Sequence, residues 1–225
     1  PVAAVWPWVF ASGATHFFYK FFLTYAYERG DLSRVYPIAR GTAPLIVALT
    51  GGLFLKDQLS LHEYLGVAVL GGGILLMEQG VFASGENRKL LPFALGSALA
   101  TAAYTMIDGS GARVSGYAVA YVAWVFVVDG MTFASVMLAW KGPGLLPRNA
   151  RAWGGGAIAA AASFGAYGIS VWAMTRAPIA VVAAVRETSI LFAVLIGWLA
   201  FGETLTRGKA LAACVIVAGV ILTRL

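Results

Sequence analysis

Residues 38–45 read Ile-Ala-Arg-Gly-Thr-Ala-Pro-Leu, which places an arginine and a proline inside an otherwise hydrophobic stretch. A related stretch, Val-Arg-Glu-Thr-Ser-Ile-Leu, occupies residues 185–191. Arg40 aligns with Arg186 at an offset of 186 − 40 = 146 residues, and the alignment continues without a gap for about forty positions. The same offset pairs Asp57 with Glu203, Leu59 with Leu205, Ser60 with Thr206, Gly73 with Gly219 and Leu76 with Leu222. The chain therefore consists of two related halves.

The composition is that of an integral membrane protein. Hydrophobic residues make up 60% of the chain and charged residues 12%, and the mean hydropathy is +0.81. An average soluble domain has about 25% charged residues, so this chain could not cover a water-exposed surface. The net charge of +6 lies mostly in short connections between apolar stretches. Basic residues placed there set membrane topology and contact lipid headgroups, and a nucleic acid partner is not expected.

Apolar stretches recur along the chain at the length needed to cross a bilayer, about 20 residues. This pattern predicts an all-α polytopic membrane protein. We expect eight spans, at residues 4–26, 33–55, 61–78, 91–108, 117–140, 153–174, 178–201 and 208–223.

The spacing of the repeat predicts five helices in each copy. The second copy, residues 91–225, holds five spans, whereas the first copy, residues 1–78, holds three, and residues 79–90 connect them. We therefore expect two further helices, about 55 residues, to precede Pro1 in the intact protein. An odd number of helices per copy inserts the copies in opposite directions. The result would be an inverted 5+5 architecture with a central site near the membrane midplane.

The ends of the two copies carry a family pattern. Residues 201–206, Phe-Gly-Glu-Thr-Leu-Thr, join an apolar helix to a last helix rich in small residues, and residues 56–60, Lys-Asp-Gln-Leu-Ser, do the same in the first copy. This pattern resembles the EamA family of the drug/metabolite transporter superfamily, whose repeats close with a Gly-Glu-x-Leu turn. The first copy departs from it by having Lys56 and Asp57 in place of Gly-Glu. The resemblance covers nearly the whole chain and is specific for fold, not for substrate.

The resemblance implies a multi-pass secondary transporter of the bacterial inner (plasma) membrane that exports small metabolites or amino-acid-like compounds by alternating access. Its expected partners are a small-molecule substrate and the lipid bilayer, it would be a monomer or homodimer, and it would need no cofactor. Orientation stays open. Nine basic residues in the connections on one side, against four on the other, place the C-terminus outside, whereas the resemblance implies both termini inside.

Charged residues inside the expected spans locate a candidate site, because ionisable side chains in a bilayer usually face a bundle interior or a cavity. Arg40 and Arg186 lie about 11 Å into their helices, close to the middle of an apolar core about 30 Å thick. In inverted copies they would approach the midplane from opposite sides and converge on one cavity. Their planar guanidinium groups would bind an anionic or zwitterionic substrate. The alternative is a structural network that neutralises both within the protein.

Three more charges lie inside the spans, namely Lys20, Asp129 and Glu187. Asp108 is set apart because it lies near the expected end of its span. Successive helical residues differ by about 100°, so Glu187 should point away from Arg186, and Asp129 is the expected partner of that arginine. With both arginines included, the interior set sums to +1, which leaves room for one anion. Glu187 and Asp129 are also candidates for proton coupling.

Aromatic side chains complete the candidate cavity, with core packing as the alternative for each. The candidates are Tyr19, Tyr36, Tyr104, Trp124 and Trp172. His16 lies four residues before Lys20, on the same face of the first expected helix. Pro37 and Pro44 bracket Arg40 and can kink its helix.

Two other classes of protein were weighed against a transporter. A membrane-embedded enzyme finds little support, because His16 and His62 lack metal-ligand spacing and no serine, nor the single cysteine Cys214, stands in a nucleophile motif. We therefore expect neither catalytic residues nor a metal site. A non-transporting membrane scaffold or receptor is the second alternative, and the buried charges argue against it.

Overall fold

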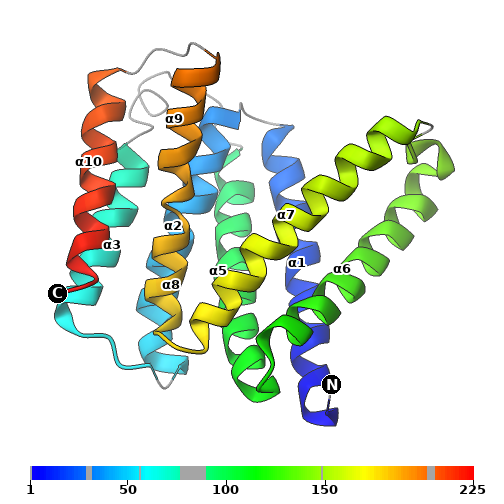
Figure 1. Ribbon diagram of the computed structural model, residues 1–225, viewed down its shortest axis with the longest axis horizontal. Coiled ribbons are helices and arrows are strands. Elements are labelled where there is room, and N and C mark those ends of the chain that lie inside the picture. The colour runs from blue at the N-terminus through cyan, green and yellow to red at the C-terminus, as the bar shows by residue number, and fades with distance from the viewer. Residues whose placement is uncertain (1, 29–31, 56, 77–89, 148, 202–205) are drawn as a thin grey trace. The chain divides into compact units, whose positions relative to one another are not determined.

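A computed structural model describes residues 2–28, 32–55, 57–76, 90–147, 149–201 and 206–225. These residues form helices and turns without a strand, which confirms the all-α prediction for this part of the chain (Figure 1). The contacts divide the chain into two compact units. Unit 1 comprises Pro1–Phe17 and Ile107–Arg176, and unit 2 comprises Phe18–Met106 and Ala177–Leu225.

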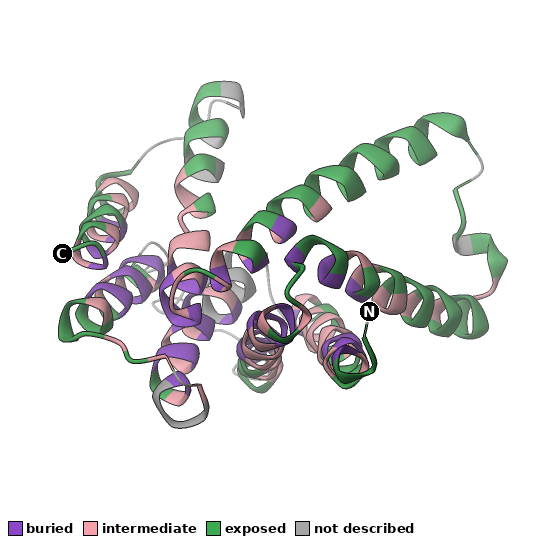
Figure 2. Cartoon of the chain, turned by 60° about the horizontal axis from the view of Figure 1, so that its bottom comes forward, coloured by how far each residue is buried: buried purple, intermediate pink, exposed green. Residues whose placement is uncertain are grey.

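Unit 1 contains the start of α1 (Trp6–Tyr27), the end of α5 (Leu91–Ser115), α6 (Ala118–Lys141) and α7 (Ala150–Met174). Its core is a cluster of valines and alanines around one tyrosine, formed by Val5, Val9, Ala112, Ala118, Tyr121, Val122, Val125 and Val171. Within the described residues, α6 and α7 are the two helices with the length and apolar composition needed to cross a membrane. Both are exposed along most of their length (Figure 2), as expected for helices that face lipid.

Local signals in the sequence set the ends of these two helices. Gly142, with a φ of +75°, ends α6, because a left-handed backbone is accessible to glycine at little cost. The side chain of Asn149 accepts a hydrogen bond of 2.7 Å from the Ala152 N–H and so caps the start of α7.

Unit 2 is built on α2 (Leu32–Phe54), α3 (Leu61–Leu76), α8 (Ile179–Arg186), α9 (Ser189–Phe201) and α10 (Arg207–Leu222), with the rest of α1 and α5. Within it, α2 packs on α3 and α8, and α3 packs on α10. The helices α3 and α10 begin alike. The hydroxyl of Ser60 accepts from the Glu63 N–H, and that of Thr206 accepts from the Lys209 N–H, both at 3.3 Å. These are repeat-related pairs.

Glycines let α3 and α10 approach closely. A Cβ added at Gly73 would lie 2.9 Å from the backbone nitrogen of Ile216, and one added at Gly219 would lie 2.5 Å from that of Leu70. Nearer the start of α3, Gly66 meets Thr223 in the same way. The residue numbers of the contacts rise along α3 while those of their partners decrease along α10. The two helices therefore run antiparallel.

The span expected at 178–201 is divided in two. Glu187 and Thr188 form a turn between α8 and α9, where their N–H groups donate to the carbonyls of Ala184 and Val185, both at 3.0 Å. These are bonds to the third preceding residue, which tighten the chain relative to an α-helix. The Thr188 hydroxyl also donates to the Val185 carbonyl at 2.7 Å and competes with the helical pattern.

Proline does not interrupt the counterpart helix. α2 continues from Leu32 to Phe54 through Pro37 and Pro44. The stretch around Arg40 is therefore one continuous helix, whereas the related stretch around Arg186 is interrupted. The interruption lies in the copy that has no proline inside the helix. α5 also departs from expectation, because it extends to Ser115, seven residues past the expected end at 108.

The contact between α3 and α10 makes a testable prediction. Gly219→Ala should lower the thermal stability of the protein in detergent, because the new methyl group meets the backbone of Leu70 and overpacking of this kind costs about 1–3 kcal/mol. Gly72→Ala is the matched control, since a Cβ there meets nothing within 4 Å. Equal losses in the two variants would contradict the close approach of α3 and α10.

Candidate functional site

Two arginines and a glutamate meet at the turn between α8 and α9, and we call them the Arg–Glu–Arg cluster. Arg40 of α2 places its Nη1 atom 3.5 Å from Glu187 Oε1. Arg186, the last residue of α8, places its Nη2 atom 3.2 Å from the same oxygen. Two guanidinium groups from repeat-related helices therefore share one carboxylate oxygen.

The Arg–Glu–Arg cluster is largely buried. The Glu187 side chain is 1% exposed, and those of Arg186 and Arg40 are 16% and 27% exposed. The second carboxylate oxygen, Oε2 of Glu187, is buried and has no hydrogen-bond partner among the described residues. A buried acceptor left without a donor costs about 1–3 kcal/mol. The formal charges of Arg40, Arg186 and Glu187 sum to +1. The Oε2 atom of Glu187 would be stabilised by a hydrogen-bond donor.

This geometry corrects one expectation and matches another. The structure brings Arg40 and Arg186 together, as their positions in the repeat predicted. The expectation that Glu187 points away from Arg186 is wrong, because the helix ends between them and regular helical spacing no longer applies. Asp129 lies half-buried on α6 of unit 1, and its pairing with Arg186 stays a prediction.

The remaining candidates are distributed over both units. In unit 2, Tyr19 and Tyr104 contact each other edge to face, with ring centroids 5.7 Å apart. Lys20 is half-buried on α1, and the side chain of Tyr36 lies outside the described part of α2. In unit 1, Trp124 and Trp172 are 39% and 50% exposed. Both are more exposed than core packing would require.

A second buried carboxylate, in unit 1, was not singled out by the sequence. Asp108 is fully buried. The Tyr121 hydroxyl donates to its Oδ1 at 2.9 Å, and the Tyr167 hydroxyl donates to its Oδ2. Ser12 hydrogen-bonds the same carboxylate, and His16 interacts with it electrostatically. We call these five residues the Asp108 cluster.

The expectation that Asp108 lies near a helix end is wrong. The glycines and serines after it favoured a loop, but α5 continues and turns only after Ser115, at Gly116, which has a φ of +70°. Gly111 has a different role, because a Cβ there would lie 2.6 Å from the Tyr121 hydroxyl oxygen. The glycine lets the tyrosine cross α5 and reach Asp108. The sequence offered one usable signal, namely an acid inside an apolar stretch.

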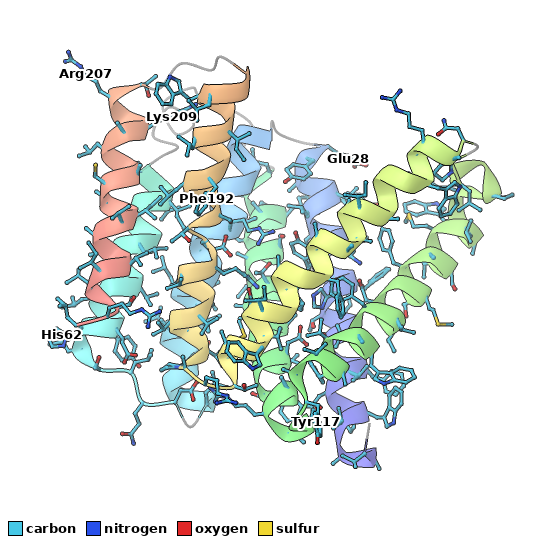
Figure 3. All side chains as sticks on the ribbon, in the orientation of Figure 1. Glu28, His62, Tyr117, Phe192, Arg207 and Lys209 are labelled. Carbon is cyan, nitrogen blue, oxygen red and sulfur yellow. The ribbon has the colours of Figure 1, made fainter. Side chains whose placement is uncertain are left out.

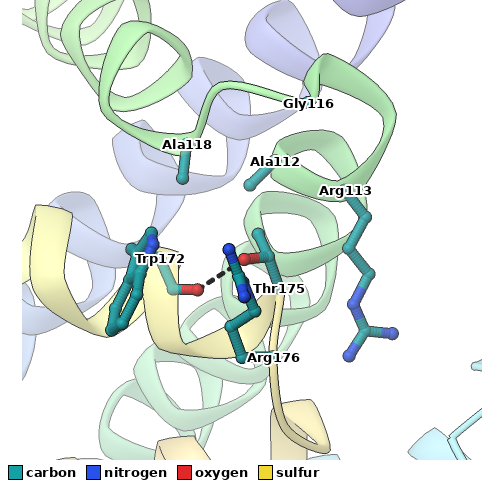
Figure 4. A pocket seen from close by; sticks show the side chains of 7 residues that line it. All are labelled: Ala112, Arg113, Gly116, Ala118, Trp172, Thr175 and Arg176. Carbon is teal, nitrogen blue, oxygen red and sulfur yellow. Dashed lines mark hydrogen bonds between the residues drawn. The ribbon is translucent and has the colours of Figure 1, made fainter.

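A cavity of about 260 Å³ opens where α5, α6 and α7 meet (Figure 4). It is lined by Ala112, Arg113, Gly116, Ala118, Trp172, Thr175 and Arg176. The Arg113 Nε atom donates to the Met174 carbonyl at 2.8 Å and so caps α7. The Arg176 guanidinium lies 5.8 Å from the centre of the Trp172 ring. Within the described residues, no group of three or more His, Cys, Asp and Glu side chains is placed to hold a metal ion.

The Arg–Glu–Arg cluster makes a prediction about stability. Glu187→Ala should lower the free energy of unfolding by about 3 kcal/mol, because it removes the carboxylate that both arginines contact and leaves two like charges close together. The double variant Arg40→Ala with Glu187→Ala should lose less than the sum of the single variants. Thermal unfolding in detergent measures both. Strictly additive losses would mean that Arg40 and Glu187 do not interact.

Comparisons with known proteins agree with this fold. A model of the EamA-like transporter family matches residues 2–78 and 88–225. Eighteen chains of solved structures also match. One of them, a crystal structure described only as that of a protein, has a TM-score of 0.72 at 18% identity, and the match covers 98% of this chain and 78% of that one. At this identity the likeness shows the fold alone. The search of curated proteins returned no match.

Proposed function

The chain belongs to the EamA-like transporter family, and we propose that it is a secondary transporter that exports small anionic or zwitterionic compounds. Proteins of this family are integral membrane transporters, not enzymes. The export direction, the bacterial inner membrane as its location and the class of substrate are part of the proposal. The observation that carries it is the Arg–Glu–Arg cluster.

The cluster favours a substrate with an anionic group. Its two guanidinium groups attract a carboxylate or phosphate, and each has five N–H donors in a planar fork. Both arginines contact Glu187 through its Oε1 atom. A carboxylate on the substrate would compete with Glu187 for these two guanidinium groups.

The buried Oε2 atom of Glu187 favours a second feature in the substrate. This oxygen can only accept while the acid is ionised, and no described residue donates to it. An ammonium or N–H group on the substrate would supply that donor. A compound with a carboxylate and an amine a few bonds apart satisfies both halves of the site. We therefore place amino-acid-like zwitterions ahead of simple anions as substrates.

We propose that residues 1–78 and 91–225 are inverted copies that move against each other in alternating access. The reciprocal contacts of α3 and α10 support this arrangement. Gly73 meets Ile216, and Gly219, the repeat mate of Gly73, meets Leu70, the repeat mate of Ile216. A two-fold axis produces such an exchange of partners, and when it lies perpendicular to the helices the equivalent helices run antiparallel, as α3 and α10 do.

The interrupted helix supports a site at the Arg–Glu–Arg cluster. Transporters commonly form substrate sites where a membrane helix is broken, because the exposed backbone and helix ends can face a cavity. Here the turn at Glu187 and Thr188 separates α8 from α9. A carboxylate that binds Arg186 would compete with Glu187 and change the contacts on both sides of the turn.

A ligand screen on the detergent-solubilised protein tests the proposed substrate class. We expect zwitterionic amino acids and small carboxylates to raise the apparent melting temperature, because a ligand that binds only the folded state stabilises it. Neutral and cationic compounds of the same size should not. The shift should disappear in Arg40→Ala and Arg186→Ala. Arg207→Ala is the matched control, since that side chain points away from the helices at the start of α10 (Figure 3).

Transport is then measured in proteoliposomes with the compound that gave the largest shift. We expect flux in the wild type and in Arg207→Ala, and at least a tenfold loss in Arg186→Ala, about 1.4 kcal/mol of lost binding. A shift produced by cations or neutral compounds that survives both arginine variants would make the cluster structural. Binding without flux in the wild type would favour a receptor.

A further inference from the structure

The Asp108 cluster is a buried acid that the proposed substrate site does not use. Four side chains face the Asp108 carboxylate, from every helix packed around it in unit 1. Ser12 and His16 come from α1, Tyr121 from α6 and Tyr167 from α7. Three of the four offer hydroxyl groups, and His16 offers an imidazole.

The protonation state of Asp108 sets the direction of the hydrogen bonds that join the helices. An ionised carboxylate only accepts hydrogen bonds, which fits the two tyrosine hydroxyls that donate to its two oxygens. A protonated acid carries one O–H donor and keeps part of its acceptor capacity. The O–H can donate to a tyrosine oxygen, which reverses that bond, or to the Ser12 hydroxyl, so protonation changes the hydrogen bonds that join α1, α6 and α7 to α5.

His16 is placed to respond to the same proton. Its Nδ1 atom lies 3.0 Å from the Ser12 carbonyl and 3.2 Å from the Ser12 hydroxyl. The ring also packs edge to face on Tyr167, with centroids 5.9 Å apart. Ser12 and Tyr167 thus connect the imidazole to the carboxylate. An ionised Asp108 with a neutral His16 leaves this part of unit 1 with a net negative charge, which a proton from water would neutralise.

A cavity lies within one helical turn of the acid. Ala112 lies four residues after Asp108 on the same face of α5, about 6 Å along the helix axis, and it lines the cavity of Figure 4. Gly116 and Ala118 form the cavity wall at the turn between α5 and α6. The side chains between this cavity and the Asp108 cluster are therefore small.

We propose that Asp108 binds and releases a proton, with His16 as its partner, and that this proton drives the transporter. The inference rests on the proposed transport function for the coupling, but the proton site itself does not depend on it. The mechanism is an exchange of hydrogen bonds: protonation of Asp108 turns one of its acceptor oxygens into a donor, and loss of the proton restores the present set of bonds.

Infrared titration of the detergent-solubilised wild-type protein tests the site without any substrate. A protonated carboxyl group has a C=O stretch that an ionised one lacks. We expect a band of this kind to appear as the pH is lowered, to disappear as it is raised again, and to be absent from Asp108→Asn. Glu63→Gln is the control, an acid in the first turn of α3 in unit 2 and outside the Asp108 cluster, and it should keep the band. The proposal would be overturned if the wild type shows no titrating band, or if Asp108→Asn shows the same titrating bands as the wild type.

Tyr121→Phe keeps the test valid if Asp108→Asn does not fold. Loss of one donor to the ionised carboxylate should move the midpoint of the band to higher pH by about one unit. Tyr117→Phe is the control and should leave the midpoint unchanged. Tyr117 is exposed and lies directly before the first residue of α6. An unchanged midpoint in Tyr121→Phe would show that the band does not belong to Asp108.

Proteoliposomes test the coupling. With a transported compound from the ligand screen, an imposed pH gradient should drive accumulation in the wild type, and Asp108→Asn should lose it while retaining the thermal shift produced by that compound. A titrating band without gradient-driven accumulation would leave a proton site but overturn its role as the driving ion. Absence of any transported compound would overturn the proposed function and leave the infrared result standing.

Discussion

Ionisable side chains inside a membrane protein have to be neutralised locally, because lipid offers them no water. The two clusters meet this constraint in different ways. Two guanidinium groups hold Glu187, whereas hydroxyl groups and an imidazole surround Asp108. Both arrangements place a buried carboxylate among donors, but the donors to Glu187 are charged, whereas those to Asp108 are neutral hydroxyl groups.

The two halves share an arginine but not an acid. Gly41 occupies the position in the first copy that Glu187 occupies in the second. A side chain at Gly41 would lie 2.9 Å from Ile74 Cγ2, so α2 and α3 pack too closely there for a glutamate. In the second copy the helix ends after Arg186, and the turn brings Glu187 back toward both arginines. A single departure from the repeat therefore creates the net charge of the site.

The sequence predicted the helices and the meeting of the arginines because both follow from periodic patterns. Apolar length located most of the helices, although the span expected at 178–201 is two helices and α5 extends past its expected end. The 146-residue offset placed Arg40 and Arg186 at equivalent positions of the two copies. It did not predict the turn at Glu187, since that turn depends on hydrogen bonds to the third preceding residue that no composition signal marks. It also missed the role of Asp108. Its donors come from three other helices, and nothing in one sequence assigns a tyrosine to a carboxylate 59 positions away.

The charges of the two proposed sites have a consequence for energetics. If one proton enters for each anion of charge −1 that leaves, two positive charges move inward per cycle, because loss of an anion equals gain of a cation. The membrane potential would then contribute about 4.6 kcal/mol per 100 mV, twice the value for one charge. A zwitterion carries no net charge, so the same exchange would gain only about 2.3 kcal/mol. Export of an anion would therefore respond more steeply to membrane potential than export of a zwitterion through the same two sites.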